Sequence, residues 1–277
     1  MRRLLSAGFA GLRKNKVLWA CMLGAFLISL CIILNGARRN VQFSVDRPLD
    51  HYFFNFLPMV GFLWAAFSGL YVGADYDHGL LRNKLVVGHT RVSVYLANLA
   101  VSIAAAILVL AAWFVGGLAG IPFLGSWSMS WPQLVCVLGL SLLTTASFCA
   151  ILMAVEMSIP SRAISAVISL GLALGLLFCA SALYNALCEQ EFIEGYVFVN
   201  GAIQPGATTP NPNYISSGTK RALFLALVNL LPTGQHILIA DNDWGMMNLP
   251  LMAGGSLGLA VLATLGGLMV FRRQNIK

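Results

Sequence analysis

The chain has 277 residues, of which 58% are hydrophobic and only 10% charged, and its mean hydropathy is +0.81. Soluble domains carry about 25% charged residues, so this composition excludes an ordinary soluble protein and indicates a membrane protein. The net charge of +7 does not indicate a nucleic-acid partner, because the basic residues cluster at the ends of apolar runs, as cytoplasmic membrane anchors do.

The first segment, residues 1–16, has the pattern of an amphipathic helix that lies in the membrane interface. Its apolar residues would share one helical face, and its basic residues gather at the two ends. These residues are Leu4, Leu5, Phe9 and Leu12, and Arg2, Arg3, Arg13, Lys14 and Lys16. The alternative is a disordered basic leader that only fixes the topology.

Six further segments are long and apolar enough to span a bilayer, whose core of about 30 Å requires about 20 apolar residues in a helix. They are residues 17–36, 52–74, 92–118, 132–157, 163–187 and 249–271. The first is too long for the apolar part of a signal peptide and lacks a clear cleavage site, so we expect it to be retained. The sequence therefore predicts an all-α polytopic membrane protein, with residues 1–277 forming a single transmembrane domain.

Charge bias predicts the orientation of these spans. With the N-terminus inside, the cytoplasmic pieces hold twelve of the seventeen Lys and Arg residues, as the positive-inside rule requires. We therefore expect both termini in the cytoplasm.

Residues 75–91, between the second and third spans, carry the signals of a short helix along the membrane surface. Acidic residues stand where this helix would begin and basic residues toward its end, the order that the helix dipole favours. They are Asp75, Asp77, Arg82 and Lys84. Gly88 can take the left-handed conformation that ends a helix, and Thr90 is a natural N-cap for the next one. The alternative is a solvated turn that only follows the positive-inside rule.

Within the spans, two features concern packing. Glu156, near the cytoplasmic end of the fourth span, predicts an interfacial ion pair with Arg162, and the alternative is a role in proton coupling. Glycine pairs spaced four residues apart allow close approach of helix backbones, although none identifies a dimer interface. The pairs are Gly69/Gly73, Gly116/Gly120, Gly171/Gly175 and Gly254/Gly258.

The longest polar piece, residues 188–248, opens with an acidic stretch and continues through Pro-Gly and Asn-Pro turn signals. The apolar run 221–231 is too short to cross a membrane, and Pro232 interrupts it by removing a backbone donor. The segment predicts an extracytoplasmic loop with a broken, re-entrant helix.

The sequence has no motif for catalysis or for holding a cofactor. None of its five lysines stands in the phosphate-binding loop G-x-x-x-x-G-K-[ST], and it contains neither H-E-x-x-H nor G-x-S-x-G. Its four histidines match no metal spacing. We therefore expect a chain that is not itself an enzyme and binds no cofactor or metal.

One stretch resembles a known family. The run Tyr76-Asp77-His78-Gly79-Leu80-Leu81-Arg82-Asn83-Lys84-Leu85, followed by Gly88-His89-Thr90-Arg91 and Tyr95-Leu96, is similar to the cytoplasmic segment of ABC-2 type permeases. The nearest resemblance is to the bacterial bacitracin-resistance and lantibiotic-immunity permeases, over the whole chain. Leu80-Leu81 departs from the Thr-Ile of related sequences. In the family this segment is the coupling helix that docks on the ATPase, which would assign docking or its support to Asp77, Gly79, Arg82, Asn83, Lys84, Leu85, Gly88 and Arg91.

The resemblance implies a type V exporter-like fold and a half-transporter in the bacterial cytoplasmic membrane. Its partners would be two copies of an ABC ATP-binding subunit, which holds ATP and Mg²⁺, a second permease copy or a homologous permease, and membrane lipids. In the family, short helices between the fifth and sixth spans cover the cargo path. This makes candidates for the extracytoplasmic path or gate of Asn229, Pro232, Thr233, Gln235 and His236. Alternatively, these residues only satisfy backbone groups at the helix break.

The implied function is export of an amphiphilic substrate, such as a peptide antibiotic, a lantibiotic or a lipid-like molecule. Two alternatives from other classes are a secondary transporter and a membrane sensor or scaffold without ATP coupling. A secondary transporter normally has ionisable or unwound sites near the bilayer midplane, and the spans here carry almost no charge except at their ends.

Overall fold

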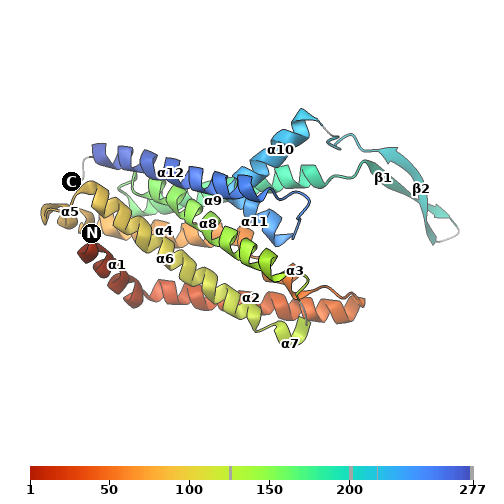
Figure 1. Cartoon of the computed structure of the whole chain (residues 1–277), viewed down its shortest axis with the longest axis horizontal. Helices are drawn as coiled ribbons and strands as arrows, with labels where there is room; N and C mark the ends of the chain where they lie inside the picture. The colour runs from red at the N-terminus through yellow and green to blue at the C-terminus, as the bar shows by residue number, and fades with distance from the viewer. Residues whose placement is uncertain (125–126, 200–201, 217, 275–277) are drawn as a thin grey trace.

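The computed structural model describes residues 1–124, 127–199, 202–216 and 218–274, and most of the chain is helical. Figure 1 shows the order of the elements. The helices are α1 (Arg2–Lys14), α2 (Lys16–Phe43), α3 (Leu49–Phe53), α4 (Leu57–Asp77), α5 (Leu80–Val86), α6 (Arg91–Leu118), α7 (Ile121–Leu124), α8 (Trp131–Glu156), α9 (Arg162–Cys188), α10 (Thr219–Leu230), α11 (Pro232–Ala240) and α12 (Leu249–Arg273). The strands are β1 (Phe192–Val199) and β2 (Ala202–Pro210).

Six helical stretches are long and apolar enough to cross a membrane, as the sequence predicts. They are α2, α3 with α4, α6, α8, α9 and α12. Local caps mark the starts of two of them: the Asn15 side chain accepts from the backbone N of Val17 at 2.8 Å, and Ser130 and Gln133 form a capping box at the start of α8. The chain is therefore a multi-pass helical membrane protein.

The amphipathic start is confirmed as a helix. In α1, Leu4 and Leu12 are buried and Leu5 is half-buried, while the basic residues at both ends are exposed. Phe9 departs from the predicted packed face, since it is 46% exposed. The helix packs on α6 closely enough that a Cβ at Gly8 would lie 2.6 Å from a methyl group of Val101. Packing against α6 rather than propensity alone thus orders this segment.

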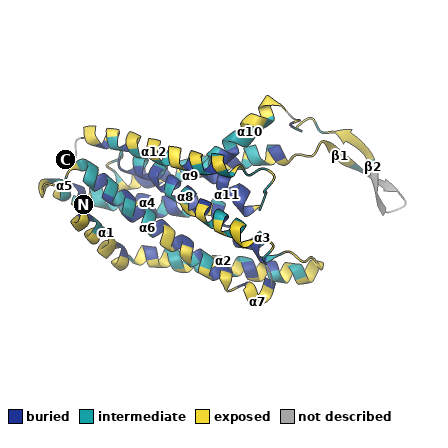
Figure 2. Cartoon of the chain, viewed as in Figure 1, coloured by how far each residue is buried: buried dark blue, intermediate teal, exposed yellow. Residues whose placement is uncertain are grey.

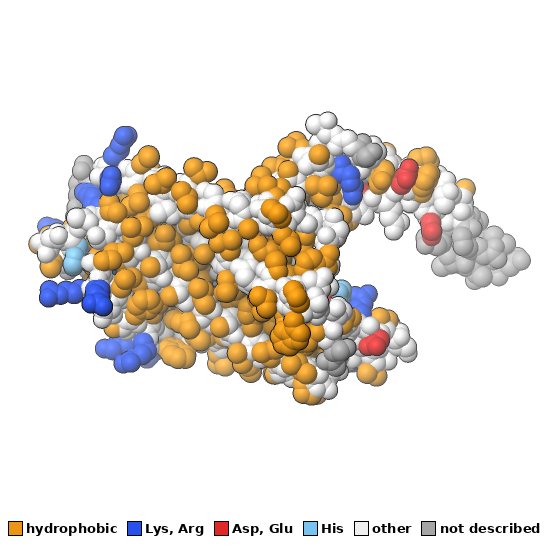
Figure 3. Space-filling view, viewed as in Figure 1, with side chains coloured by type: hydrophobic (Ala, Val, Ile, Leu, Met, Phe, Trp, Pro, Cys, Tyr) orange, Lys and Arg blue, Asp and Glu red, His pale blue; other side chains and the backbone are white. Residues whose placement is uncertain are grey.

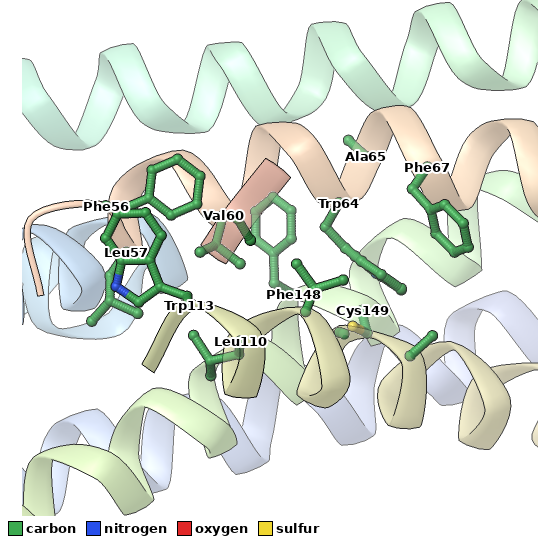
Figure 4. Close-up of a cluster of buried hydrophobic side chains, with 14 of the residues drawn as sticks. Phe56, Leu57, Val60, Trp64, Ala65, Phe67, Leu110, Trp113, Phe148 and Cys149 are labelled. Carbon is green, nitrogen blue, oxygen red and sulfur yellow. The ribbon is translucent and has the colours of Figure 1, made fainter. Parts of the chain in front are cut away.

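The long helices pack in the neighbouring pairs α2 with α6, α4 with α9, and α8 with α12. Figure 2 shows that buried residues concentrate where α4, α6 and α8 meet. The aromatic core there is drawn in Figure 4, where Phe56 stacks on Trp113 with ring centroids 4.1 Å apart. The indole N–H of Trp113 donates to the carbonyl O of Phe53 at 2.9 Å, so its one polar atom is satisfied.

The all-α expectation is wrong in one region. Strands β1 and β2 form an antiparallel hairpin that projects from the bundle, with Ile193 opposite Thr209 and a bulge after Glu194 (Figure 1). The predicted turn at Pro205-Gly206 is wrong, because both residues lie within β2. Proline is tolerated there because a two-stranded hairpin consists only of edge strands.

The bundle has two chemically different ends. The N-terminus, α5 and the end of α12 lie together at one end, while α3, α7 and the hairpin lie at the other (Figure 1). Lys and Arg side chains gather at the end with α1 and α5, although a few stand at the opposite end (Figure 3). The orientation in the membrane stays a prediction from this charge bias.

Candidate functional site

The short helix α5 lies at the basic end, between α4 and α6. It begins after Gly79, whose φ is +63°, and is followed by Gly88 with a φ of +96°. Both angles favour glycine. Thr90 caps α6 as expected, accepting from the backbone N of Ser93 at 3.2 Å.

The expected start of this helix is wrong. Asp75 and Asp77 lie in the last turn of α4, which continues through both of them, rather than at the N-terminus of α5. Helix α4 packs against α9 and continues to Asp77, three residues past the end at residue 74 that the sequence predicts. Asp75 instead forms an ion pair across the turn, with its Oδ2 2.6 Å from Lys84 Nζ.

Lys84 and Leu81 attach α5 to the bundle. Besides its pair with Asp75, Lys84 Nζ lies 3.4 Å from Oδ1 of Asn98 on α6. Leu81 is fully buried against the helices around it, and Leu85 is half-buried. The attachment joins α5 to both α4 and α6, so a displacement of α5 would be passed to two spanning helices.

The opposite face of α5 is open. Leu80, Val86 and Val87 are 43%, 77% and 77% exposed. Arg82, Asn83 and Asp77 are exposed beside them. A hollow of 280 Å³ lies between this face and α1, lined by Arg3, Leu4, Ala7, Leu80, Asn83, Lys84, Val87 and His89. Apolar side chains exposed at a polar end of the molecule are typical of a surface that contacts another protein or the membrane.

Arg91 lies away from this open face and joins α6 to the end of α12. Its Nη1 lies 2.8 Å, 3.1 Å and 2.5 Å from the carbonyl oxygens of Phe271, Arg272 and Gln274. These carbonyls are among those that a helix C-terminus leaves unpaired. Arg91 therefore closes α12 and supports the basic end as a whole.

The predicted ion pair between Glu156 and Arg162 is wrong. Glu156 is fully buried, and its Oε1 accepts from Ser68 Oγ at 2.5 Å and from Ser169 Oγ at 3.3 Å. Arg162 is exposed at the start of α9. Within the described ranges the one ion pair is Lys84 with Asp75. Glu156 ends α8 and Arg162 begins α9, and the turn between them leaves the two side chains on different faces of the bundle.

The predicted break in the helix after residue 231 is confirmed. Helices α10 and α11 meet at Leu231 with a bend of 94°. Pro232 occupies the first position of α11, where its missing N–H is not needed. A Cβ at Gly234 would lie 2.3 Å from the carbonyl O of Val228, so only glycine lets the two helices approach this closely.

Gln235 is the centre of the polar contacts at this break. Its Nε2 donates to the carbonyl oxygens of Asn229 at 2.8 Å and Met252 at 3.0 Å. Its Oε1 accepts from Thr144 Oγ1 at 2.5 Å and Ser256 Oγ at 2.8 Å. The side chain thus joins the break to α8 and α12 and is fully buried.

The other candidates for the outer path are buried as well. Asn229 donates to the carbonyl oxygens of Leu225 and Met246, and Thr233 donates to that of Leu176 at 2.9 Å. His236 is fully buried, and neither ring nitrogen has a hydrogen-bond partner among the described residues. In this conformation Asn229, Thr233 and Gln235 satisfy backbone groups around the break and none of them faces an open path.

Sequence reasoning missed Asp50. This carboxylate is fully buried and accepts from the backbone N of Ser128 at 3.0 Å, from the Ser128 hydroxyl, and from Asn242 Nδ2 at 3.2 Å. It joins α3 to the chain before α8 and to the turn after α11. Its position near a helix start was the only available signal, since both partners are distant in sequence.

No protein-family model matches the chain, and no curated protein is significantly similar to it. Among the residues that the structure describes, no group of three or more His, Cys, Asp or Glu side chains could hold a metal ion. The open face of α5 is therefore the candidate site on which a functional proposal can be built.

Proposed function

We propose that this chain is the permease subunit of an ABC exporter of the ABC-2 type, with a six-helix fold like that of type V exporters. Two copies of a separate ATPase subunit bind ATP and Mg²⁺, and a second copy or a homologous permease completes the translocation path. The cargo is an amphiphilic peptide or lipid-like molecule that leaves the bacterial cytoplasmic membrane. The observation that carries the proposal is the open face of α5 in the segment that resembles the coupling helix.

The physical support is the division of α5 into an attached face and an open face. Leu81 and the Asp75–Lys84 pair fix α5 to α4 and α6, while Arg82 and Val86 are exposed. A rigidly mounted helix with exposed apolar and basic side chains is suited to receive a push from a partner and to transmit it. The chain has no phosphate-binding loop of its own, so the energy would come from that partner.

Reversing the charge at Arg82 tests the docking role. Arg82→Glu should lower recovery of the ATPase with the tagged chain by about tenfold, because an interfacial charge reversal replaces attraction with repulsion. The measurement is copurification from membranes in a mild detergent, with the partner identified by mass spectrometry and by its Walker motif.

Arg273→Glu is the matched control, since Arg273 is exposed at the same end but outside α5. It should leave recovery unchanged. Lys84 is unsuitable as a probe because its loss would also break the pair with Asp75. Recovery of the intact wild-type chain with no Walker-motif ATPase would refute the proposal and favour a secondary transporter or a sensor.

A further inference from the structure

The outer end of α2 carries an unusual number of cations. Three of the five Lys and Arg residues expected outside lie within ten residues of each other, namely Arg38, Arg39 and Arg47. Such a cluster opposes the positive-inside rule, so it needs a local reason. Figure 3 shows a few basic side chains with a histidine beside them at the end opposite α1 and α5.

The guanidinium groups of these arginines make few contacts within the fold. No ion pair in the described part of the chain includes them, and the Arg39 side chain makes none of the hydrogen bonds found there. Arg47 Nη1 lies 2.8 Å from Nε2 of His51, its one side-chain contact. All three are exposed. Their guanidinium groups are thus available to a ligand.

The position of the three arginines along α2 matches the level of the lipid headgroups in a membrane. Helix α2 has 28 residues, so it is about 42 Å long at 1.5 Å per residue, against a hydrocarbon core of about 30 Å. The apolar part of α2 ends at Gly36, and Arg38 and Arg39 follow directly. They would therefore lie at the level of the outer phosphate groups.

The chain beyond α2 is folded back to form a cavity here. The hollow has a volume of 250 Å³ and is lined by Arg39, Asn40, Phe43, Val45, Arg47 and Tyr52. Asn40 fixes its walls: its Nδ2 donates to the carbonyl O of Arg47 at 2.8 Å, and its Oδ1 accepts from the Tyr52 hydroxyl at 3.0 Å. The backbone turn at Ser44, with φ of 51°, brings the loop back over the helix.

The side chains that line this cavity indicate the chemistry of its ligand. Two guanidinium groups line one preformed hollow, and guanidinium pairs with phosphate oxygens through paired hydrogen bonds. A second, apolar hollow of 570 Å³ lies on a neighbouring face of the same helix end, lined by Ala37, Arg38, Val41, Gln42 and Phe123. Val41 in it is 83% exposed, a surface suited to acyl chains.

We propose that the outer end of α2 binds the phosphate headgroup of an anionic lipid, with Arg39 and Arg47 on the phosphate and the Ala37–Val41 face against the chains. The site is independent of ATP coupling and of the exported cargo. Free phosphate shares the chemistry of the headgroup. The level of the cavity relative to the membrane and the adjoining apolar hollow favour the lipid.

The test measures the melting temperature of the purified full chain with three soluble probes. They are dihexanoyl phosphatidylglycerol, dihexanoyl phosphatidylcholine, which has the same chains without net charge, and inorganic phosphate. The phosphatidylglycerol should raise the melting temperature of the wild type by about 3 °C near saturation, and the other two should not. Arg39→Gln and Arg47→Gln should each raise the lipid concentration that gives half of this effect by about tenfold.

Two further variants separate a built site from general charge. Lys220→Gln removes another outer cation, at the start of α10, and should keep the full effect. Asn40→Ala keeps all charges but loosens the wall, and should weaken the effect. A wild-type response that persists in both arginine variants, an equal loss in Lys220→Gln, or an equal response to phosphatidylcholine would overturn the proposal. An equal response to inorganic phosphate would reject the lipid as the ligand.

Discussion

Replacing Gln235 by leucine should lower the melting temperature of the purified protein by about 5–10 °C, which corresponds to roughly 2–4 kcal/mol. The amide of Gln235 holds four polar groups on three helices, and leucine fills a similar volume without bonding any of them. A buried polar group left without a partner destabilises a fold by about 1–3 kcal/mol.

The loss should be smaller than four full penalties. The hydroxyls of Thr144 and Ser256 lie 3.4 Å apart and can turn toward each other when the amide is gone. The carbonyl of Asn229 has no such substitute, because α10 ends there and the chain turns by 94°. The bend between α10 and α11 should therefore open first, and protease sites near Leu231 should become accessible.

Gln42→Leu is the matched control, since Gln42 is exposed near the end of α2 and its side chain makes no hydrogen bond with the described residues. Its melting temperature should stay within about 1 °C of the wild type. Equal shifts in the two variants would show that the Gln235 contacts do not stabilise the break. The measurement is thermal unfolding in detergent followed by tryptophan fluorescence.

The features that sequence predicted well are those with local causes. Pro232 breaks a helix through its own ring and missing donor, and Thr90 caps α6 through a bond three residues away. The apolar spans likewise follow from composition alone. Each of these results depends only on residues close together in the sequence, so no knowledge of the tertiary arrangement is needed.

The errors arise where a side chain has its partner on another helix. Glu156 bonds Ser68, which is 88 residues away, and no pattern in either segment announces that contact. Asp50 accepts a hydrogen bond from Asn242, which is 192 residues away, and local sequence does not predict that contact either. For Asp75 the charge pattern was detected but assigned to a helix start, because the extent of α4 depends on its packing against α9.

The hairpin was missed for a different reason. Residues 192–199 are rich in aromatic and apolar side chains, and an Asn-Gly pair follows at 200–201, which lies outside the described residues. This combination is a hairpin signal in sequence. The prediction takes Pro205-Gly206 as a turn and does not use the Asn-Gly pair, although an edge strand tolerates proline.

Substitutions at the glycine pairs are expected to have the second large effect on stability. The pairs have the same spacing in the sequence, but the structure places them in different surroundings. A Cβ at Gly69 would lie 2.7 Å from the Cα of Ala166, and one at Gly73 would lie 2.7 Å from the Cα of Arg162. Both contacts are with the backbone of α9, which cannot rotate away as a side chain can. At Gly171 and Gly175, on α9 itself, a Cβ would meet nothing within 4 Å.

Gly69→Leu should therefore force α4 and α9 apart and lower the melting temperature by about 5–10 °C, or prevent accumulation of folded protein. Gly171→Leu adds the same side chain to an open face and removes a helix-weakening glycine, so it should leave the isolated chain as stable as the wild type or slightly more stable. Fluorescence-detected size-exclusion chromatography after heating measures both. A stable Gly69→Leu protein would contradict the close packing of α4 on α9. Because α4 leads directly into α5, the same variant should also weaken copurification of the ATPase, whereas Gly171→Leu should not.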